Sequence, residues 1–278
     1  MSKQIPNFEW FIDREKDKPC LVAGNAPTIK EFPFKSFKGL VFMINEGPEL
    51  MKGMVKPDYW LSANRYYPIP HLHAKQINRF NNSVFIFSDT AVYYHNKYSY
   101  NQNAIKDSLK IPWFAFDDRH FDHKKCSPQR PCCDLVDRFP DRITLYEFVK
   151  NYYLMPSLCP GGATAVLFAL TFAIIMGCSP IYIHGVELPI YFKDYLHFNK
   201  FHFRMVRPMY WVMKSRIKGI IKGKPEFSPF YEYLELTLAS FDYLAKICKM
   251  RGIGLYNLSK SSTLNRLESL SYQEAEKI

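Results

Sequence analysis

The sequence predicts an α/β fold built on one open, mostly parallel β-sheet, and three observations support this prediction. Short apolar runs recur along the chain and close on polar residues, as expected of strands buried on both faces. The segment between Gly161 and Gly177 is apolar nearly all round, which indicates a helix at the centre of the molecule. Another apolar run follows this helix directly, and such alternation is typical of a parallel sheet covered by helices.

The first strand is expected at Cys20–Gly24. It ends in a turn that contains Asn25 and Ala26, after which Pro27 and Thr28 open a helix. Three more strands of the same kind are expected at Leu40–Ile44, Asp58–Ser62 and Ser83–Phe87. The carboxyl ends of parallel strands lie at one edge of a sheet, so we expect a binding site at that edge.

The rest of the chain is less regular. Residues 93–153 are rich in Tyr, Asn, His, Asp, Cys and Pro, which favours an irregular excursion over the sheet edge rather than a separate domain. The elements expected around and after the central helix are the strand Pro180–Glu187, the helix Tyr231–Met250 and the strand Leu255–Ser259. We therefore expect one domain over residues 1–266, followed by a polar tail that frays at residues 267–278.

The composition and net charge of the chain exclude some classes of protein and favour others. The chain has 278 residues, and 37 Lys and Arg against 26 Asp and Glu give a formal charge of +11, which favours anionic partners. The 23 Phe and 19 Tyr exclude a disordered chain. Irregularly placed Cys residues and an N-terminus without an apolar signal core predict a cytoplasmic protein. The longest apolar run, Ala163–Cys178, is shorter than the roughly 20 residues of a membrane-spanning helix.

Asparagines follow the first three predicted strands. The turn from Gly24 to Thr28 leads from a strand into a helix, where free N–H groups and the helix dipole suit a phosphate, with Thr28 as a cap. Asn25, Asn45 and Asn64 each lie just past a strand, and their amides can bind a base, a ribose or a phosphate. A plain strand-to-helix turn is the alternative, because neither a Walker A motif nor a dinucleotide fingerprint is present.

The start of the central helix is a second candidate anion site. Gly161 and Gly162 precede the apolar helix, and Thr164 lies in its first turn. Paired glycines there can expose a helix N-terminus to an anion, or they can allow the helix to pack closely on the sheet. Both interpretations remain open.

Several of these segments resemble one superfamily with a Rossmann-like sheet. They are LVAGNAPTIKEF, GGATAVLFALTFAIIMGCSPIYIHGVE and LYNLSKSSTL, together with the strand-end Asn45 and Asn64. The superfamily groups bacterial sialyltransferases of the Campylobacter lipooligosaccharide type with the DUF115 proteins. The DUF115 proteins include the Maf flagellin glycosylation factors and the archaeal hydroxymethylpterin diphosphokinases. The similarity covers about Cys20 to Asn64, Cys159 to Glu187 and Leu255 to Leu264.

The resemblance implies a site for the CMP part of a donor sugar. In the sialyltransferases, the matching asparagines hold CMP, which assigns that role to Asn25, Asn45 and Asn64, and Thr164 matches a further donor contact. Gly24, Ala26, Thr28, Gly161 and Gly162 belong to the same predicted site. Two departures concern catalysis. The stretch from Phe227 to Glu235 contains no His to match the catalytic base, and Leu188, Pro189 and then Tyr191 replace a Tyr pair.

The candidates for a general base therefore come from elsewhere. His197 and His202 flank two phenylalanines in a basic region, and a neutral-pH base for an acceptor hydroxyl is typically a His. Glu187, at the carboxyl end of a predicted strand, is an equal competitor, in a position where most DUF115 proteins have Asp. His184 lies inside the strand, where a buried and hydrogen-bonded His is expected.

No metal or other cofactor is expected. The residues His120, His123, Cys126, Cys132 and Cys133 are of the types that bind zinc, but their spacing fits no standard zinc module. A Cys-rich ordered loop is the preferred interpretation of this segment.

Residues 191–230 form a predicted basic lid. Between Lys193 and Lys224 the basic residues are interleaved with aromatic ones, and Asp194 is the single acid. Met209–Lys222 has the character of a helix that lies on an anionic membrane. We therefore expect an anionic glycan or glycolipid acceptor and peripheral contact with the inner membrane surface. The alternative is a solvated basic face whose aromatic side chains pack on the core.

Together these features predict a metal-independent glycosyltransferase that moves a CMP-activated nonulosonic sugar to a hydroxyl acceptor. One alternative is a 6-hydroxymethylpterin diphosphokinase-like enzyme that uses ATP and Mg²⁺, although carboxylates to hold the metal are few at the strand ends. The second alternative is a non-catalytic protein whose basic segment binds nucleic acid, which the sequence does not favour.

Overall fold

The structure is a computed structural model. It describes residues 3–45, 47–51, 54–62, 74–88, 106–116, 165–186, 238, 241–242, 244–259, 264 and 267–277.

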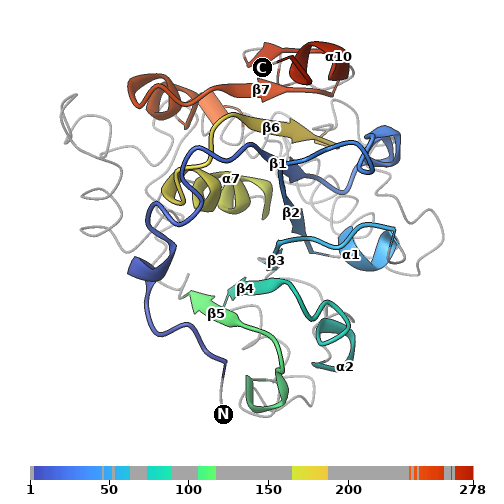
Figure 1. Cartoon of the computed structure of the whole chain (residues 1–278), viewed down its shortest axis with the longest axis vertical. Coiled ribbons are helices and arrows are strands. Elements are labelled where there is room, and N and C mark those ends of the chain that lie inside the picture. The colour runs from blue at the N-terminus through green and yellow to red at the C-terminus, as the bar shows by residue number, and fades with distance from the viewer. Residues whose placement is uncertain are drawn as a thin grey trace, which may run out of the picture.

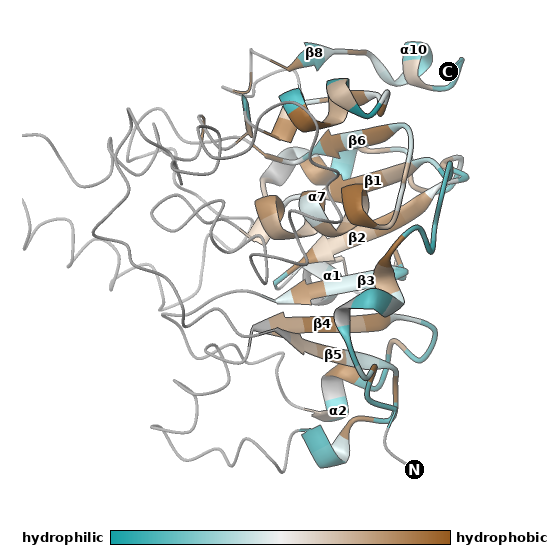
Figure 2. Ribbon diagram, turned by 90° about the vertical axis from the view of Figure 1, so that its left-hand side faces the viewer, coloured by the Kyte–Doolittle hydropathy of each residue, from teal (hydrophilic) through white to brown (hydrophobic). Residues whose placement is uncertain are grey.

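A single sheet of eight parallel strands organises the fold, in the order β5-β4-β3-β2-β1-β6-β7-β8. The strands are β1 (Cys20–Ala23), β2 (Leu40–Ile44), β3 (Tyr59–Ser62), β4 (Val84–Ser88), β5 (Trp113–Phe116), β6 (Ile181–His184), β7 (Leu255–Asn257) and β8 (Glu268–Ser269). The predicted α/β class with an open parallel sheet is confirmed. β1 and β4 are apolar along their length, as expected of strands covered on both faces, whereas the edge strand β8 is polar (Figure 2).

Two layers cover the sheet (Figure 1). One face packs against α7 (Ala165–Ile175), whose residues are all buried, which confirms the predicted central helix. Residues 238, 241–242 and 244–250 are helical as predicted, and Phe241, Leu244 and Cys248 pack in the same cluster as α7. The other face packs against three short helices, η2 (Pro27–Glu31), α1 (Gly47–Leu50) and α2 (Ala74–Ile77). None of the helices in the described ranges is long and apolar enough to span a membrane.

Two assignments made from the sequence are corrected. Within the expected excursion at 93–153, residues 106–108 are helical, and Trp113–Phe116 form β5, which pairs with β4. The expected polar tail does not fray over residues 267–277. This segment forms β8 and then α10 (Tyr272–Ala275), which begins with a capping box between Ser271 and Glu274. Leu267 is buried and Tyr272 packs against the core, so apolar contacts hold the segment on the sheet.

The strand order reverses between β1 and β6. The chain builds β1 to β5 in one direction across the sheet and then returns to add β6, β7 and β8 on the other side of β1. Ala23 and His184 are in register at the ends of these two central strands. Such a reversal is the switch point at which open α/β sheets generally bind their ligands.

Glycines allow the segments that follow β1 and β6 to meet at the switch point. Beyond the strands, Gly24 N–H donates to the His184 carbonyl at 2.8 Å, and Ala26 N–H donates to the Gly185 carbonyl at 3.0 Å. A Cβ on Gly24 would overlap the Gly185 carbonyl oxygen and would lie 2.7 Å from its carbon. Gly185 itself has a φ of +70°, which side chains rarely allow. Both glycines are therefore required for the close approach of the backbones.

We predict that Gly24→Ala lowers the free energy of unfolding by about 3 kcal/mol or more, because the backbone of Gly185 cannot move aside cheaply. The matched control is Gly252→Ala. Gly252 also has a positive φ, of +68°, but a Cβ there meets nothing within 4 Å. Gly252→Ala should therefore lower the free energy of unfolding by only about 1 kcal/mol. Urea titrations of both variants measure the difference, and equal losses would contradict the close-approach explanation.

Candidate functional site

Asn25 follows β1 at the switch point. The residue is nine-tenths buried, and its Oδ1 has no hydrogen-bond partner among the residues that the structure describes. This oxygen lies 2.9 Å from the position that a Cβ on Gly47 would occupy, so the Asn25 amide contacts the start of α1. A buried acceptor without a donor costs about 1–3 kcal/mol, and such an atom in a folded protein requires an explanation. A bound ligand that donates a hydrogen bond would supply one.

Asn45 occupies the equivalent position after β2. Ala23 on β1 is in register with Met43 on β2, and Asn25 and Asn45 each lie two residues after these paired positions. Asn45 has a left-handed backbone with a φ of +42°, which Asn tolerates better than most residues. Its N–H donates to the Leu61 carbonyl at 2.8 Å, and its carbonyl accepts from Trp60 Nε1, also at 2.8 Å. The structure thus places two of the three strand-end asparagines at neighbouring strand ends.

The turn after β1 differs from the predicted anion site. The predicted helix is the five-residue 3-10 helix η2, whose N-cap is Ala26, and no side chain caps it. The expected capping role of Thr28 is therefore wrong. The N–H of Ala26 is bonded to Gly185, and Pro27 has none to offer, so the turn presents few donors to a phosphate. Packing against Gly185 accounts for Gly24 without a ligand.

His184 is buried and hydrogen-bonded, as the sequence predicted. Nε2 lies 2.9 Å from the Thr28 carbonyl and 2.8 Å from the Tyr272 hydroxyl. Nδ1 lies 3.3 Å from Ser259 Oγ, which in turn accepts from the Gly185 N–H at 2.9 Å. Burial lowers the pKa of His184, so the ring is held in its neutral form. The ring thereby ties the turn after β1 to the C-terminal part of the chain.

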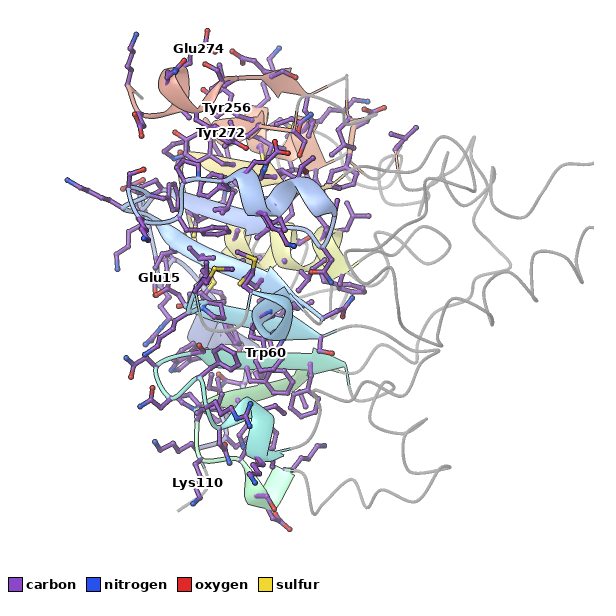
Figure 3. All side chains as sticks on the ribbon, turned by 90° about the vertical axis from the view of Figure 1, so that its right-hand side faces the viewer. Glu15, Trp60, Lys110, Tyr256, Tyr272 and Glu274 are labelled. Carbon is purple, nitrogen blue, oxygen red and sulfur yellow. The ribbon has the colours of Figure 1, made fainter. Side chains whose placement is uncertain are left out.

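Sequence reasoning missed four residues of this region. Gly47 and Trp60 contact the strand-end asparagines, and Ser259 and Tyr272 contact His184. Tyr272, labelled in Figure 3, belongs to the segment predicted to fray. No local pattern indicates these contacts, because each joins segments far apart in the chain.

Two carboxylates at the opposite, amino-terminal edge of the sheet already have hydrogen-bond partners. Glu15, labelled in Figure 3, accepts from the Tyr59 hydroxyl at 2.6 Å and from Lys18 Nζ at 2.7 Å. Burial raises the pKa of Glu15, but these two hydrogen bonds and the positive charges of Lys18 and Arg14 together outweigh it, and the net pKa is lowered. Asp58 Oδ2 accepts from the Val41 N–H at 2.8 Å. These groups therefore stabilise the fold and leave the carboxyl edge as the candidate site.

The remaining predicted site residues lie outside the described residues. They are Asn64, Gly161, Gly162, Thr164, Glu187, Tyr191, His197 and His202, and the same holds for the His120–Cys133 segment and the basic lid. Across the described ranges, no group of three or more His, Cys, Asp or Glu side chains could hold a metal ion.

Comparison with solved structures finds the same fold at low sequence identity. The chain is similar to a Maf glycosyltransferase from Magnetospirillum magneticum AMB-1, with 13% identity and a TM-score of 0.50 over 93% of this chain. The chain spans about a third of that protein, 34% of its length. It also aligns with the Campylobacter jejuni sialyltransferase CstII in complex with CMP-3FNeuAc, with 15% identity and a TM-score of 0.47, covering 91% of this chain and 86% of that one.

An apo α-2,3-sialyltransferase from Campylobacter jejuni aligns with 16% identity and a TM-score of 0.36, over 92% of this chain and 80% of that one. Neither protein-family models nor curated proteins give a match. At 13% identity, the likeness to the Maf glycosyltransferase supports the Rossmann-like fold and no more.

The neutral His184 predicts a pH dependence of stability. Its pKa is lower in the folded than in the unfolded chain, so the unfolded chain binds more protons as the pH falls below about 6.5. Stability is therefore lost as the pH falls, by at most about 1.4 kcal/mol per pH unit from this group. His184→Gln, which cannot titrate, should show a shallower loss between about pH 7 and pH 5 in urea titrations. Parallel profiles for the two proteins would show that another group is responsible.

Proposed function

We propose that the protein is a glycosyltransferase whose donor is a CMP-activated nonulosonic sugar and whose acceptor is a hydroxyl group. The observation that supports this proposal most directly is the buried Oδ1 of Asn25 at the switch point, which no described residue hydrogen-bonds. An amide acceptor suits the donor groups of a nucleoside, which are ribose hydroxyls and the amino group of cytosine. Asn45 at the next strand end supplies a second amide, and the sequence resemblance assigns both residues to CMP.

The fold is compatible with this assignment. The Maf protein, which aligns with 93% of this chain, is a glycosyltransferase. A site at the β1–β6 switch point leaves the carboxyl edge of β2 and β3 for the rest of the nucleotide. The likeness supports the fold, whereas the activity and the donor are our proposal.

The proposed reaction is a single displacement. The acceptor oxygen forms a bond to the anomeric carbon as the bond from that carbon to the phosphate oxygen breaks, and CMP leaves with the electron pair. A general base takes the hydroxyl proton, and the candidates remain His202, His197 and Glu187. In this scheme the residues at the strand ends bind and orient the donor, and no step needs a metal ion.

A nucleotide panel tests the function. We expect CMP and CDP, but not ATP, GTP or UDP, to raise the melting temperature of the protein, and Mg²⁺ to be unnecessary. Stabilisation by ATP with Mg²⁺ alone would favour the diphosphokinase alternative.

Asn25→Ala should weaken CMP binding about fivefold, because one hydrogen bond is lost, while the free energy of unfolding stays unchanged or rises by about 1 kcal/mol.

The matched control for Asn25→Ala is Asn78→Ala. Asn78 lies away from the switch point, and its amide donates to the Ser108 carbonyl at 2.9 Å and accepts from the Lys110 N–H at 2.7 Å. Asn78→Ala should therefore lower stability and leave CMP binding unchanged. Unaltered CMP affinity in folded Asn25→Ala would contradict the assignment of the site.

The acceptor is proposed from the sequence of the basic lid. A positive segment concentrated in residues 191–230 favours an anionic acceptor, such as a phosphorylated glycolipid at a membrane surface. We predict that reversing the charges of Lys214, Arg216 and Lys218 abolishes sedimentation with anionic vesicles at low salt and leaves CMP binding intact. A wild-type protein that ignores such vesicles would disprove the membrane contact. Tight, steeply salt-dependent binding of oligonucleotides would favour the nucleic-acid alternative.

A further inference from the structure

Trp60 on β3 is buried, and it directs its one polar group at the backbone of Asn45. The side chain is fully buried, and its ring packs edge-on against Phe80 and Phe85, with centroids 5.2 and 5.1 Å away. Its indole Nε1–H donates to the backbone carbonyl of Asn45 at 2.8 Å. A ring fixed in this way is a rigid donor, because moving the N–H would require repacking of the aromatic cluster.

The hydrogen bond falls on a strained residue of the candidate site. Asn45 is left-handed, a conformation that costs most residues about 1–2 kcal/mol. Both backbone polar groups of Asn45 are held by neighbouring positions of β3, the N–H by the Leu61 carbonyl and the carbonyl by Trp60. The direction of the Asn45 side chain therefore depends on β3.

The same turn reaches the other asparagine. Two residues after Asn45, Gly47 lies so close to Asn25 that a Cβ on Gly47 would be 2.9 Å from Asn25 Oδ1. A shift of the turn at Asn45 would therefore also change the surroundings of the Asn25 amide. Trp60 is therefore linked to both asparagines through the turn, by its hydrogen bond to the Asn45 backbone and by the approach of Gly47 to Asn25.

We propose that Trp60 is a positioning residue for the nucleotide: its indole N–H fixes the carbonyl of Asn45 and thereby orients the strand-end amides that bind the donor. The inference rests on the proposed function in one respect, that Asn45 contacts the nucleotide. Trp60 itself does not have to touch the ligand, since its full burial places it beneath the turn.

A second buried tryptophan provides a matched control. Trp113 on β5 belongs to the same aromatic cluster as Trp60 and is 3% exposed. Its ring lies 5.7 Å from that of Phe87, but its Nε1 has no hydrogen-bond partner among the described residues. Tryptophan-to-phenylalanine substitutions at the two positions remove similar volumes from one cluster, and only the substitution at Trp60 removes a hydrogen bond.

The first arm measures CMP affinity by calorimetry. Trp60→Phe should weaken CMP binding about fivefold to tenfold, and Trp113→Phe should stay within about twofold of the wild type. In an Asn45→Ala background the effect of Trp60→Phe should disappear, because the two residues act through one contact. Additive effects, equal losses in the two phenylalanine variants, or unchanged affinity in Trp60→Phe would each overturn the proposal.

The second arm needs no ligand. Exchange of the Asn45 amide hydrogen should be about tenfold faster in Trp60→Phe than in Trp113→Phe, because the turn loses the hydrogen bond from the Trp60 indole. Equal exchange rates would overturn the positioning role even if CMP does not bind. Absence of CMP binding by the wild type, with the exchange difference present, would instead disprove the proposed function and leave the positioning of Asn45 established.

If Trp60→Phe does not fold, the wild-type protein still decides the question. Saturating CMP should slow exchange of the Trp60 indole hydrogen, because a ligand on Asn45 stabilises the turn to which that hydrogen is bonded. The Trp113 indole hydrogen should be unaffected. Equal responses of the two indoles to CMP would overturn the proposal.

Discussion

The contact between Gly24 and Gly185 is the constraint on which the rest of the candidate site depends. Strands β1 and β6 end side by side, and the segments that follow them stay joined by backbone hydrogen bonds from Gly24 and Ala26. Because these backbones nearly touch, the turn after β1 has little freedom, and Asn25 is buried where a looser turn would leave it exposed. His184, at the end of β6, lies within hydrogen-bond distance of Thr28, Ser259 and Tyr272. The turn after β1 is therefore also held by the C-terminal part of the chain.

This arrangement separates two tasks that the sequence had assigned to one motif. Glycine in the turn after the first strand suggested space for a phosphate, but the backbone of Gly185 occupies that space. Hydrogen-bonding capacity is left instead to the amide of Asn25, whose acceptor oxygen has no partner within the described part of the chain. A neutral amide can recognise a nucleoside without adding charge, while the net charge of +11 provides the long-range attraction for an anionic molecule.

The sequence was most informative where the physics is local. Strands β1, β2, β3, β4, β6 and β7 are short apolar runs, since a parallel strand is buried on both faces, and each could be predicted. Strand β5 is itself a short apolar run, Trp113–Phe116, but it was overlooked because it lies within a stretch rich in polar residues. Strand β8 consists of exposed Glu268 and Ser269 and does not show the pattern. The strand-end positions of Asn25 and Asn45 followed from the strands. The contacts of Trp60 and Tyr272 did not, because they depend on how distant segments pack.

The strand order also affects how the chain can acquire this structure. Strands β1 to β5 pair with their neighbours in sequence, but the second edge of β1 is completed by β6, about 160 residues further along the chain. During synthesis, one edge of the central strand, with its unpaired N–H and C=O groups, therefore stays open until β6 has emerged. Unpaired strand edges are sites of misassociation, so the interval before β6 arrives is the vulnerable stage of biogenesis. Chaperones that act late in translation would have the most to protect.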